Sequence, residues 1–76
     1  MNVEILTADK TLFTGEADVV TLPGVNGSFQ ILNGHAPMIA NLAKGKLSIK
    51  GTSNAESFEV NGGLVEVLKD KVVVLV

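Results

Sequence analysis

One stretch of the sequence decides the fold, V-T-L-P-G-V-N-G-S-F-Q-I-L-N-G-H-A-P-M-I-A-N-L (Val20–Leu42), because it concentrates the residues that form tight turns. It contains both prolines, three of the eight glycines and the only histidine. Pro23 has a fixed φ and no N–H group, and the nearby Gly24 and Gly27 can adopt a positive φ without a Cβ penalty. Turns of this kind on either side of a short apolar segment predict a shaped projection that is suited to contact with a partner.

The rest of the sequence alternates between short apolar segments and turn residues. Lys46–Lys50 and Ser57–Asn61 place apolar residues on one face and polar residues on the other, which is the pattern of strands with one solvated face. Gly62-Gly63 is expected to break the strand before Leu64, as a bend or as a place where another backbone comes close, and Lys69-Asp70 is expected to connect two strands as a hairpin. The sequence therefore predicts an all-β fold, a small flattened antiparallel β-sandwich or barrel of about eight to ten short strands, with residues 1–76 forming one domain.

Two segments carry more apolar surface than the core of so short a chain needs. Val72–Val76 is apolar on both faces, and a strand of this kind must be covered on both sides. Met38–Leu42 is expected to be a strand because Ile39 is β-branched and the segment is too short for a stable helix. We expect the surplus apolar surface of Val72–Val76 and of Met38-Ile39 to meet a partner.

The composition excludes several classes of function. The net charge is −2, and the six basic residues are all lysines, so the bidentate guanidinium that favours phosphate and guanine recognition is missing. With three aromatic residues there are too few rings to stack bases, and nucleic-acid binding is not expected. No apolar run approaches the ~20 residues of a membrane span, and the N-terminus does not resemble a signal peptide. We expect a soluble chain without direct membrane insertion.

The sequence contains no recognisable constellation of catalytic or metal-binding residues. His35 has no cysteine and no second histidine to work with, whereas zinc requires three or four ligands and a general base requires a nucleophile within reach. The glycines around Asn26 and His35 do not follow the spacing of phosphate-binding loops. We therefore expect no catalytic residue, no metal and no cofactor.

One alternative function is that of a carrier domain. Biotin and lipoyl carrier domains are flattened β-sandwiches of about this length that present one lysine at the tip of a hairpin. Lys44 lies between Ala43 and Gly45, and Lys69 lies between Leu68 and Asp70, so neither lysine matches the usual surroundings of the modified residue. This alternative stays open at this point, with solvated turn lysines as the simpler interpretation.

As a whole the sequence resembles the N-terminal β-sandwich domain of the epsilon subunit of F-type ATP synthases. The similarity covers nearly the full length, in order and spacing, and is most specific in the run L-P-G-x-x-G-x-F-x-I-L-x-G-H-A-P. The matching segments are V-E-I-L-T-A-D-K-T-L-F-T-G-E (Val3–Glu16), V-V-T-L-P-G-V-N-G-S-F-Q-I-L-N-G-H-A-P-M (Val19–Met38), K-G-K-L-S-I (Lys44–Ile49), F-E-V-N-G-G-L-V-E-V (Phe58–Val67) and V-V-V-L-V (Val72–Val76).

The sequence departs from the family pattern in three respects. Gln30 stands where the family usually has glycine, and Asn33 where it usually has proline. The pair of C-terminal helices that the family usually carries does not follow Val76, which suggests either a shortened chain or a naturally short subunit. The regulatory roles of those helices are therefore not carried over.

The resemblance implies a role in the central stalk of a rotary ATP synthase. In such enzymes the domain binds the gamma subunit and the membrane ring of c subunits, and couples ring rotation to ATP synthesis without a catalytic site of its own. It implies a c-ring interface at Asn26, Gly27, Ser28 and Phe29, and a gamma interface at His35, Ala36, Pro37 and Met38. It also implies a peripheral location on the cytoplasmic face of an energy-transducing membrane, a bacterial plasma membrane or a chloroplast thylakoid.

Overall fold

The computed structural model describes residues 1–52 and 54–76, which contain seven strands and no helix. The strands are β1 (Asn2–Leu6), β2 (Thr11–Glu16), β3 (Val19–Gly24), β4 (Gly27–Leu32), β5 (Met38–Lys50), β6 (Ala55–Leu68) and β7 (Lys71–Leu75). The predicted all-β fold is therefore confirmed, and Met38 begins a strand as expected.

The strands form one continuous sheet in the order β2-β1-β7-β6-β5-β3-β4. Neighbouring strands are antiparallel, as predicted, except that β1 and β7 run parallel from Asn2 beside Lys71 to Leu6 beside Leu75. A parallel pair of this kind joins the two ends of the chain, and local sequence patterns do not reveal it. The backbone N–H of Val76 continues the contact by donating to the carbonyl oxygen of Leu6 (2.9 Å).

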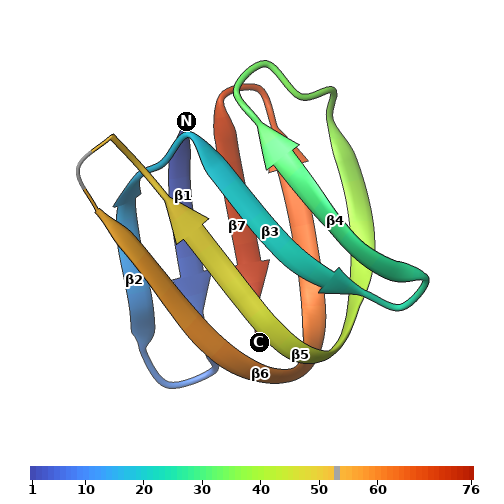
Figure 1. The fold of residues 1–76 in the computed structure, drawn as a ribbon. Coiled ribbons are helices and arrows are strands. Elements are labelled where there is room, and N and C mark those ends of the chain that lie inside the picture. Colours follow the sequence, from blue (N-terminus) through green and yellow to red (C-terminus); the bar gives the residue numbers. More distant parts are fainter. Residues whose placement is uncertain (53) are drawn as a thin grey trace.

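The long strands β5 and β6 turn this single sheet into two layers (Figure 1). They pair along almost their whole length, from Met38 beside Val67 to Lys50 beside Ala55, and both bend near the middle. On one side of the bend, β6 pairs with β7, and on the other side β5 pairs with β3. The sheet thus folds back on itself, and the apolar core lies between its two halves.

The bend explains why the structure has seven strands and not the eight to ten short ones that were predicted. The expected break of the strand at Gly62-Gly63 is wrong, because β6 continues through both glycines, whereas the expected close approach of another backbone is found, since a Cβ atom on Gly63 would overlap the Leu75 carbonyl oxygen. Their φ values of 128° and 144° are accessible to glycine and allow the strand to bend without ending. In the same way, β5 runs through Lys44-Gly45, where two separate strands had been expected.

Apolar side chains from six of the strands, together with two residues outside them, fill the space between the layers. The buried residues are Met1, Val3, Ile5, Ala17, Val20, Leu22, Ile31, Leu42, Leu47, Ile49, Val60, Val65, Val67, Val72 and Val74. In β7 the two faces differ as expected, because Val72 and Val74 are buried whereas Leu75 is 48% exposed. The core is aliphatic, and its largest fully buried side chains are those of isoleucine and leucine.

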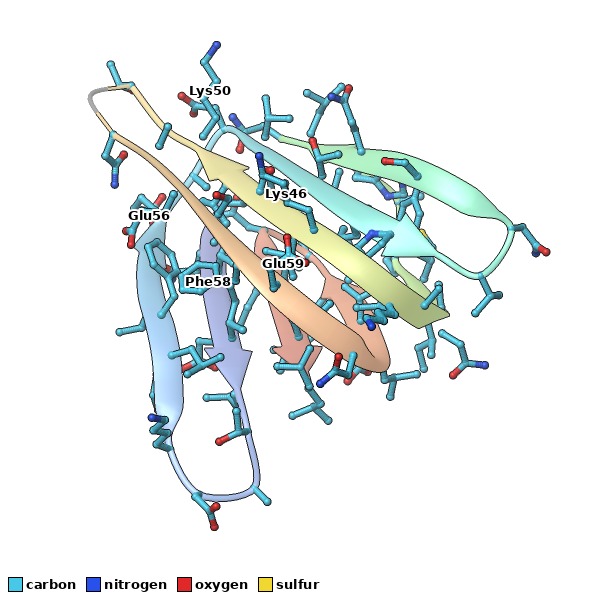
Figure 2. The ribbon with its side chains drawn as sticks, turned by 60° about the horizontal axis from the view of Figure 1, so that its bottom comes forward. Lys46, Lys50, Glu56, Phe58 and Glu59 are labelled. Carbon is cyan, nitrogen blue, oxygen red and sulfur yellow. The ribbon has the colours of Figure 1, made fainter. Side chains whose placement is uncertain are left out.

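The outer face of the β5–β6 hairpin is polar (Figure 2). Lys46 lies directly opposite Glu59 across the strand pair, and Lys50 follows further along β5. On the same strand as Glu59, the next side chain, Phe58, turns the other way and packs edge-on against Phe13, with ring centroids 6.4 Å apart. The charged face and the aromatic pair follow from the alternation of side chains along a strand.

Candidate protein-binding site

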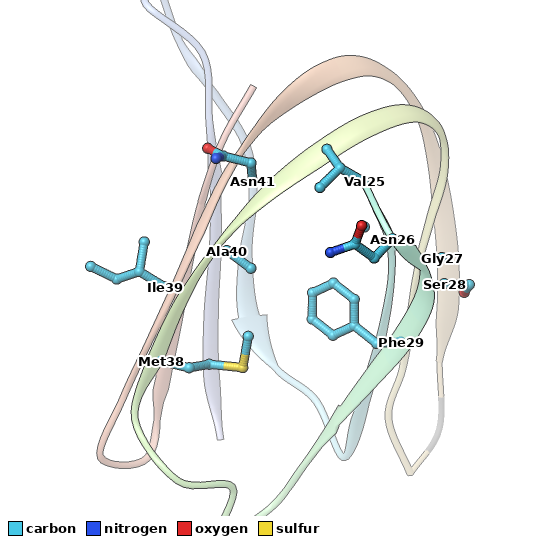
Figure 3. A pocket seen from close by; sticks show the side chains of 10 residues that line it. Val25, Asn26, Gly27, Ser28, Phe29, Met38, Ile39, Ala40 and Asn41 are labelled. Atoms are coloured by element: carbon cyan, nitrogen blue, oxygen red, sulfur yellow. The ribbon is translucent and has the colours of Figure 1, made fainter.

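An open groove of about 550 Å³ lies at one end of the sandwich (Figure 3). One wall is the connection between β3 and β4 with the start of β4, and the other wall is the first part of β5. The ten residues that line it are Gly24, Val25, Asn26, Gly27, Ser28, Phe29, Met38, Ile39, Ala40 and Asn41.

The first wall is a tight hairpin. Gly24 pairs with Gly27 across the connection, and the positive φ of this turn falls on Gly27 (122°). A Cβ atom on Gly24 would lie 2.8 Å from the ring of Phe29 and 2.7 Å from the carbonyl oxygen of Gly27, so a side chain at position 24 would displace the ring. The glycine thus allows the half-buried Phe29 ring to pack against the hairpin and form part of the groove.

The second wall follows the alternation of β5. Met38 and Ala40 point toward Phe29, whereas Ile39 points away from it (Figure 3). Ile39 is 66% exposed, which makes it the most exposed large apolar residue in the described part of the chain. Val25, at the tip of the opposite wall, is 61% exposed. The groove is therefore bordered by apolar side chains that the fold leaves in contact with water.

The groove is uncharged. Its polar side chains are the amides of Asn26 and Asn41 and the hydroxyl of Ser28, and none of the lining residues is titratable. Within residues 1–52 and 54–76, no group of three or more His, Cys, Asp or Glu side chains could hold a metal ion. Such a surface can bind an uncharged partner segment, and its one hydroxyl, that of Ser28, has no acid or base among the lining residues to activate it as a nucleophile.

The structure places the two predicted interfaces differently with respect to this groove. All four residues of the predicted c-ring interface, Asn26, Gly27, Ser28 and Phe29, line it. Of the predicted gamma interface only Met38 does so. His35, Ala36 and Pro37 belong to the connection between β4 and β5 and lie outside the groove. Met38 and Phe29 are the residues where the two predicted surfaces meet.

A second, shallower hollow extends the apolar surface around the edge of β5. It is lined by Pro37, Met38, Ile39, Glu66, Val67 and Leu68. Leu68 is 41% exposed, and Leu32 beyond it is 52% exposed. Val25, Leu32 and Leu68 were not predicted to belong to either interface. Each is a large apolar residue within or directly before a turn, where side chains are usually exposed. That position is the signal that could have identified all three.

His35 is held by the turn that precedes β5. Its backbone N–H donates to the carbonyl oxygen of Leu32 (3.1 Å), and its ring Nδ1 lies 2.7 Å from the carbonyl oxygen of Ala36. A carbonyl oxygen can only accept, so Nδ1 carries the proton in this contact. In the neutral ring Nε2 is then an acceptor that can face a partner.

The side chain of Asn33 ties the same turn to Met1 and Asp18. The Leu32–His35 turn has Gly34 at φ 81°, the conformation that a type II turn requires at its third residue. The side-chain oxygen of Asn33 accepts a hydrogen bond from the Met1 amino group (2.9 Å), and its Nδ2 donates to Asp18 Oδ1 (3.3 Å). Asn33 occupies the second position of the turn, where proline is also favoured.

We expect Asn33→Ala to lower the free energy of unfolding by about 1 kcal/mol, because the variant loses the two side-chain hydrogen bonds. Asn33→Pro loses the same bonds but fixes φ at a value that the turn accepts, and should be more stable than Asn33→Ala by about 0.4–1 kcal/mol. Urea titrations of the two variants and the parent chain measure both differences. A proline variant less stable than the alanine variant would contradict the type II assignment of position 33.

Comparison with known proteins identifies the family. The protein-family model described as "ATP synthase, Delta/Epsilon chain, beta-sandwich domain" matches residues 1–76. The chain belongs to this family, and the resemblance drawn from its motifs is confirmed. The match favours this family over the carrier alternative. Lys44 lies within β5 and not at a hairpin tip, and Lys69 lies in the turn between β6 and β7 but lacks the usual neighbours of a modified lysine. No helix in the described part of the chain is long and apolar enough to cross a membrane.

The chain is similar to epsilon chains from several lineages. It is 40% identical over 74 residues to the ATP synthase epsilon chain of Chlorobaculum tepidum, covering 96% of this chain and 84% of that one. It is 41% identical over 76 residues to the chloroplastic epsilon chain of Phaeodactylum tricornutum, covering 100% of this chain and 57% of the relative. The fold is also similar to a chain in the central stalk/c-ring structure of Tetrahymena thermophila mitochondrial ATP synthase, with a TM-score of 0.84, 22% identity, and coverage of 97% and 60%.

Proposed function

We propose that this chain is a non-catalytic rotor module of the central stalk, which couples rotation of the c-ring to ATP synthesis by binding both the gamma subunit and the ring. The observation that carries the proposal is the uncharged groove, bordered by exposed apolar side chains, in which a predicted c-ring residue, Phe29, lies beside a predicted gamma residue, Met38. Exposed apolar side chains that border a groove are typical of a docking site.

The proposed assignment divides the site between two partners. The tip of the β3–β4 hairpin, with Asn26, Gly27 and Ser28 exposed, faces polar loops of the c-ring. The surface formed by the β4–β5 connection, Met38 and the neighbouring hollow faces gamma. A peripheral position on the cytoplasmic side of an energy-transducing membrane follows from these contacts. Membership of the family and the absence of titratable groups from the groove support a binding role.

Binding to gamma tests the proposal directly. The folded chain is mixed with purified gamma, and complex formation is measured by size-exclusion chromatography with light scattering and by isothermal titration calorimetry. We expect a stable one-to-one complex. A folded chain that does not bind gamma would overturn the proposal.

His35→Asp should weaken binding to gamma by about tenfold, because it replaces the acceptor Nε2 by a carboxylate that must lose its hydration in the complex. Titration calorimetry with gamma measures the loss, and a urea titration checks that the variant is folded. His35→Asn is the matched control for the turn, since its amide can still donate to the Ala36 carbonyl oxygen. If His35→Asp binds gamma as the parent does, His35 has a structural role in the turn alone.

A further inference from the structure

The first part of β5 has one backbone edge without a partner strand. Strand β3 pairs with β5 where Val19–Thr21 face Ser48–Lys50, and the contact resumes only at Gly24 opposite Leu42. Residues Met38–Asn41 pair with β6 on one side, and within the described residues no strand lies along their other side. This edge forms one border of the groove.

The backbone groups of this edge have a defined direction. The N–H of Val25 donates to the carbonyl oxygen of Asn41 (3.4 Å), so the Asn41 carbonyl points away from β6. Successive residues of a strand direct their N–H and C=O groups to opposite sides, so the groups of Ile39 point the same way as those of Asn41. Ile39 therefore presents one donor and one acceptor to the open edge.

The side chains at this edge do not protect it. Exposed edges in soluble proteins usually carry lysine, proline or a bulge, or are covered by another segment. The edge here reads Met38-Ile39-Ala40-Asn41, without a charge, and Ile39 is 66% exposed. The residues of the edge and of the groove beside it carry no charge, and the groove combines apolar side chains with amide and hydroxyl groups, so a complementary partner is an uncharged segment.

We propose that Met38–Asn41 accepts an extended, uncharged segment of the gamma subunit as an added strand, with Ile39 N–H and C=O as its central hydrogen-bonding groups. The inference rests on the proposed function and specifies how the same site binds. Addition of a strand to an open sheet edge derives affinity from main-chain hydrogen bonds and specificity from neighbouring pockets, a role that the groove beside Met38 can fill. A second copy of this chain fits less well, because it would bring its own β3–β4 hairpin to the same edge.

Amide hydrogen exchange of the isotope-labelled chain, alone and with gamma, tests the added strand. In the free chain the amides of Ile39 and Asn41 should exchange rapidly, since both face the open edge. In the complex we expect the Ile39 amide to exchange at least about tenfold more slowly. The amide of Ala40, which faces β6, is an internal control because it is bonded in both states.

A proline substitution tests the donor itself. Ile39→Pro removes the outward N–H while leaving the pairing with β6 intact, and proline is tolerated at such an edge position. Ile39→Ala is the matched control, because it loses a similar amount of side chain but keeps the N–H. We expect Ile39→Pro to bind gamma about fivefold to tenfold more weakly than Ile39→Ala.

The outcomes separate this inference from the proposed function. If gamma binds while Ile39 stays unprotected and the two variants bind equally, strand addition is wrong and the rotor function stands. If the folded chain does not bind gamma, both the strand addition and the proposed rotor function are wrong. If Ile39 becomes protected in the chain alone as its concentration rises, and sedimentation shows a dimer, the strand comes from a second copy and the assignment to gamma is overturned.

Discussion

Replacing Gly63 by alanine should lower the free energy of unfolding by about 3 kcal/mol, the largest effect that we expect from any single methyl group in this chain. Two causes combine at this position. The φ of Gly63 is 144°, which is strained for a residue with a side chain, and a Cβ atom would overlap the carbonyl oxygen of Leu75 in β7. A 76-residue protein has a total stability of roughly 4–11 kcal/mol, so the loss is a large fraction of it.

Gly62→Ala is the matched control for this prediction. Gly62 has a similar φ of 128°, but the nearest atom to an added Cβ, the carbonyl oxygen of Leu42, lies at 3.5 Å. This variant should lose only the conformational part, about 1–2 kcal/mol. Urea titrations followed by circular dichroism measure both variants, and the difference between them isolates the close approach of β6 to β7. Equal losses would mean that the contact with Leu75 relaxes at little cost.

Ile39→Asp should weaken binding to gamma by about a hundredfold while leaving the chain folded. Ile39 is 66% exposed, so a carboxylate at this position remains hydrated in the free protein. In the complex the same carboxylate would be enclosed beside Glu66, its like-charged neighbour across the strand pair, and no cation among the described residues lines either hollow to pair with it. Removing a charge from water without compensation accounts for the expected loss.

Ile39→Thr controls for the loss of the side chain, since threonine keeps the β-branched shape and carries no charge. It should bind gamma much more tightly than Ile39→Asp. Ser57→Asp controls for position, because Ser57 is exposed on β6 and lies outside both hollows and outside Val72–Val76. Titration calorimetry with gamma measures all three. Weakening by Ser57→Asp to the same degree would show that added negative charge, and not the site, reduces binding.

Local patterns in the sequence predicted much of the fold. The alternation in Lys46–Lys50 and the Lys69-Asp70 connection are features of neighbouring residues, and both are found as predicted, with Asp70 at φ 60° in the turn between β6 and β7. The parallel contact of β1 with β7 could not be predicted, because it joins residues from opposite ends of the chain. At Gly62-Gly63 the predicted close approach of another backbone is found but the predicted break in the strand is not, since a glycine pair looks the same whether a strand ends or bends.

The candidate site was predicted in its components but not in its arrangement. The turn residues of Val20–Leu42 correctly indicated a shaped region, and Ile39 was expected to carry surplus apolar surface. The sequence could not show that Phe29 and Met38 lie beside one groove while Pro37 lies outside it. That separation depends on the point where β5 begins and on the side to which each of its residues turns, which are set by pairing with β6.

The course of β5 and β6 through both layers has a mechanical consequence for the proposed rotor module. A load that enters at Met38, in one layer, reaches the other layer along two covalent backbones that pair along almost their whole length. It does not have to pass only through the apolar contacts between the layers. In the proposed role the two strands would transmit torque as one continuous element, and Gly62-Gly63 is the part of β6 that sets how it bends.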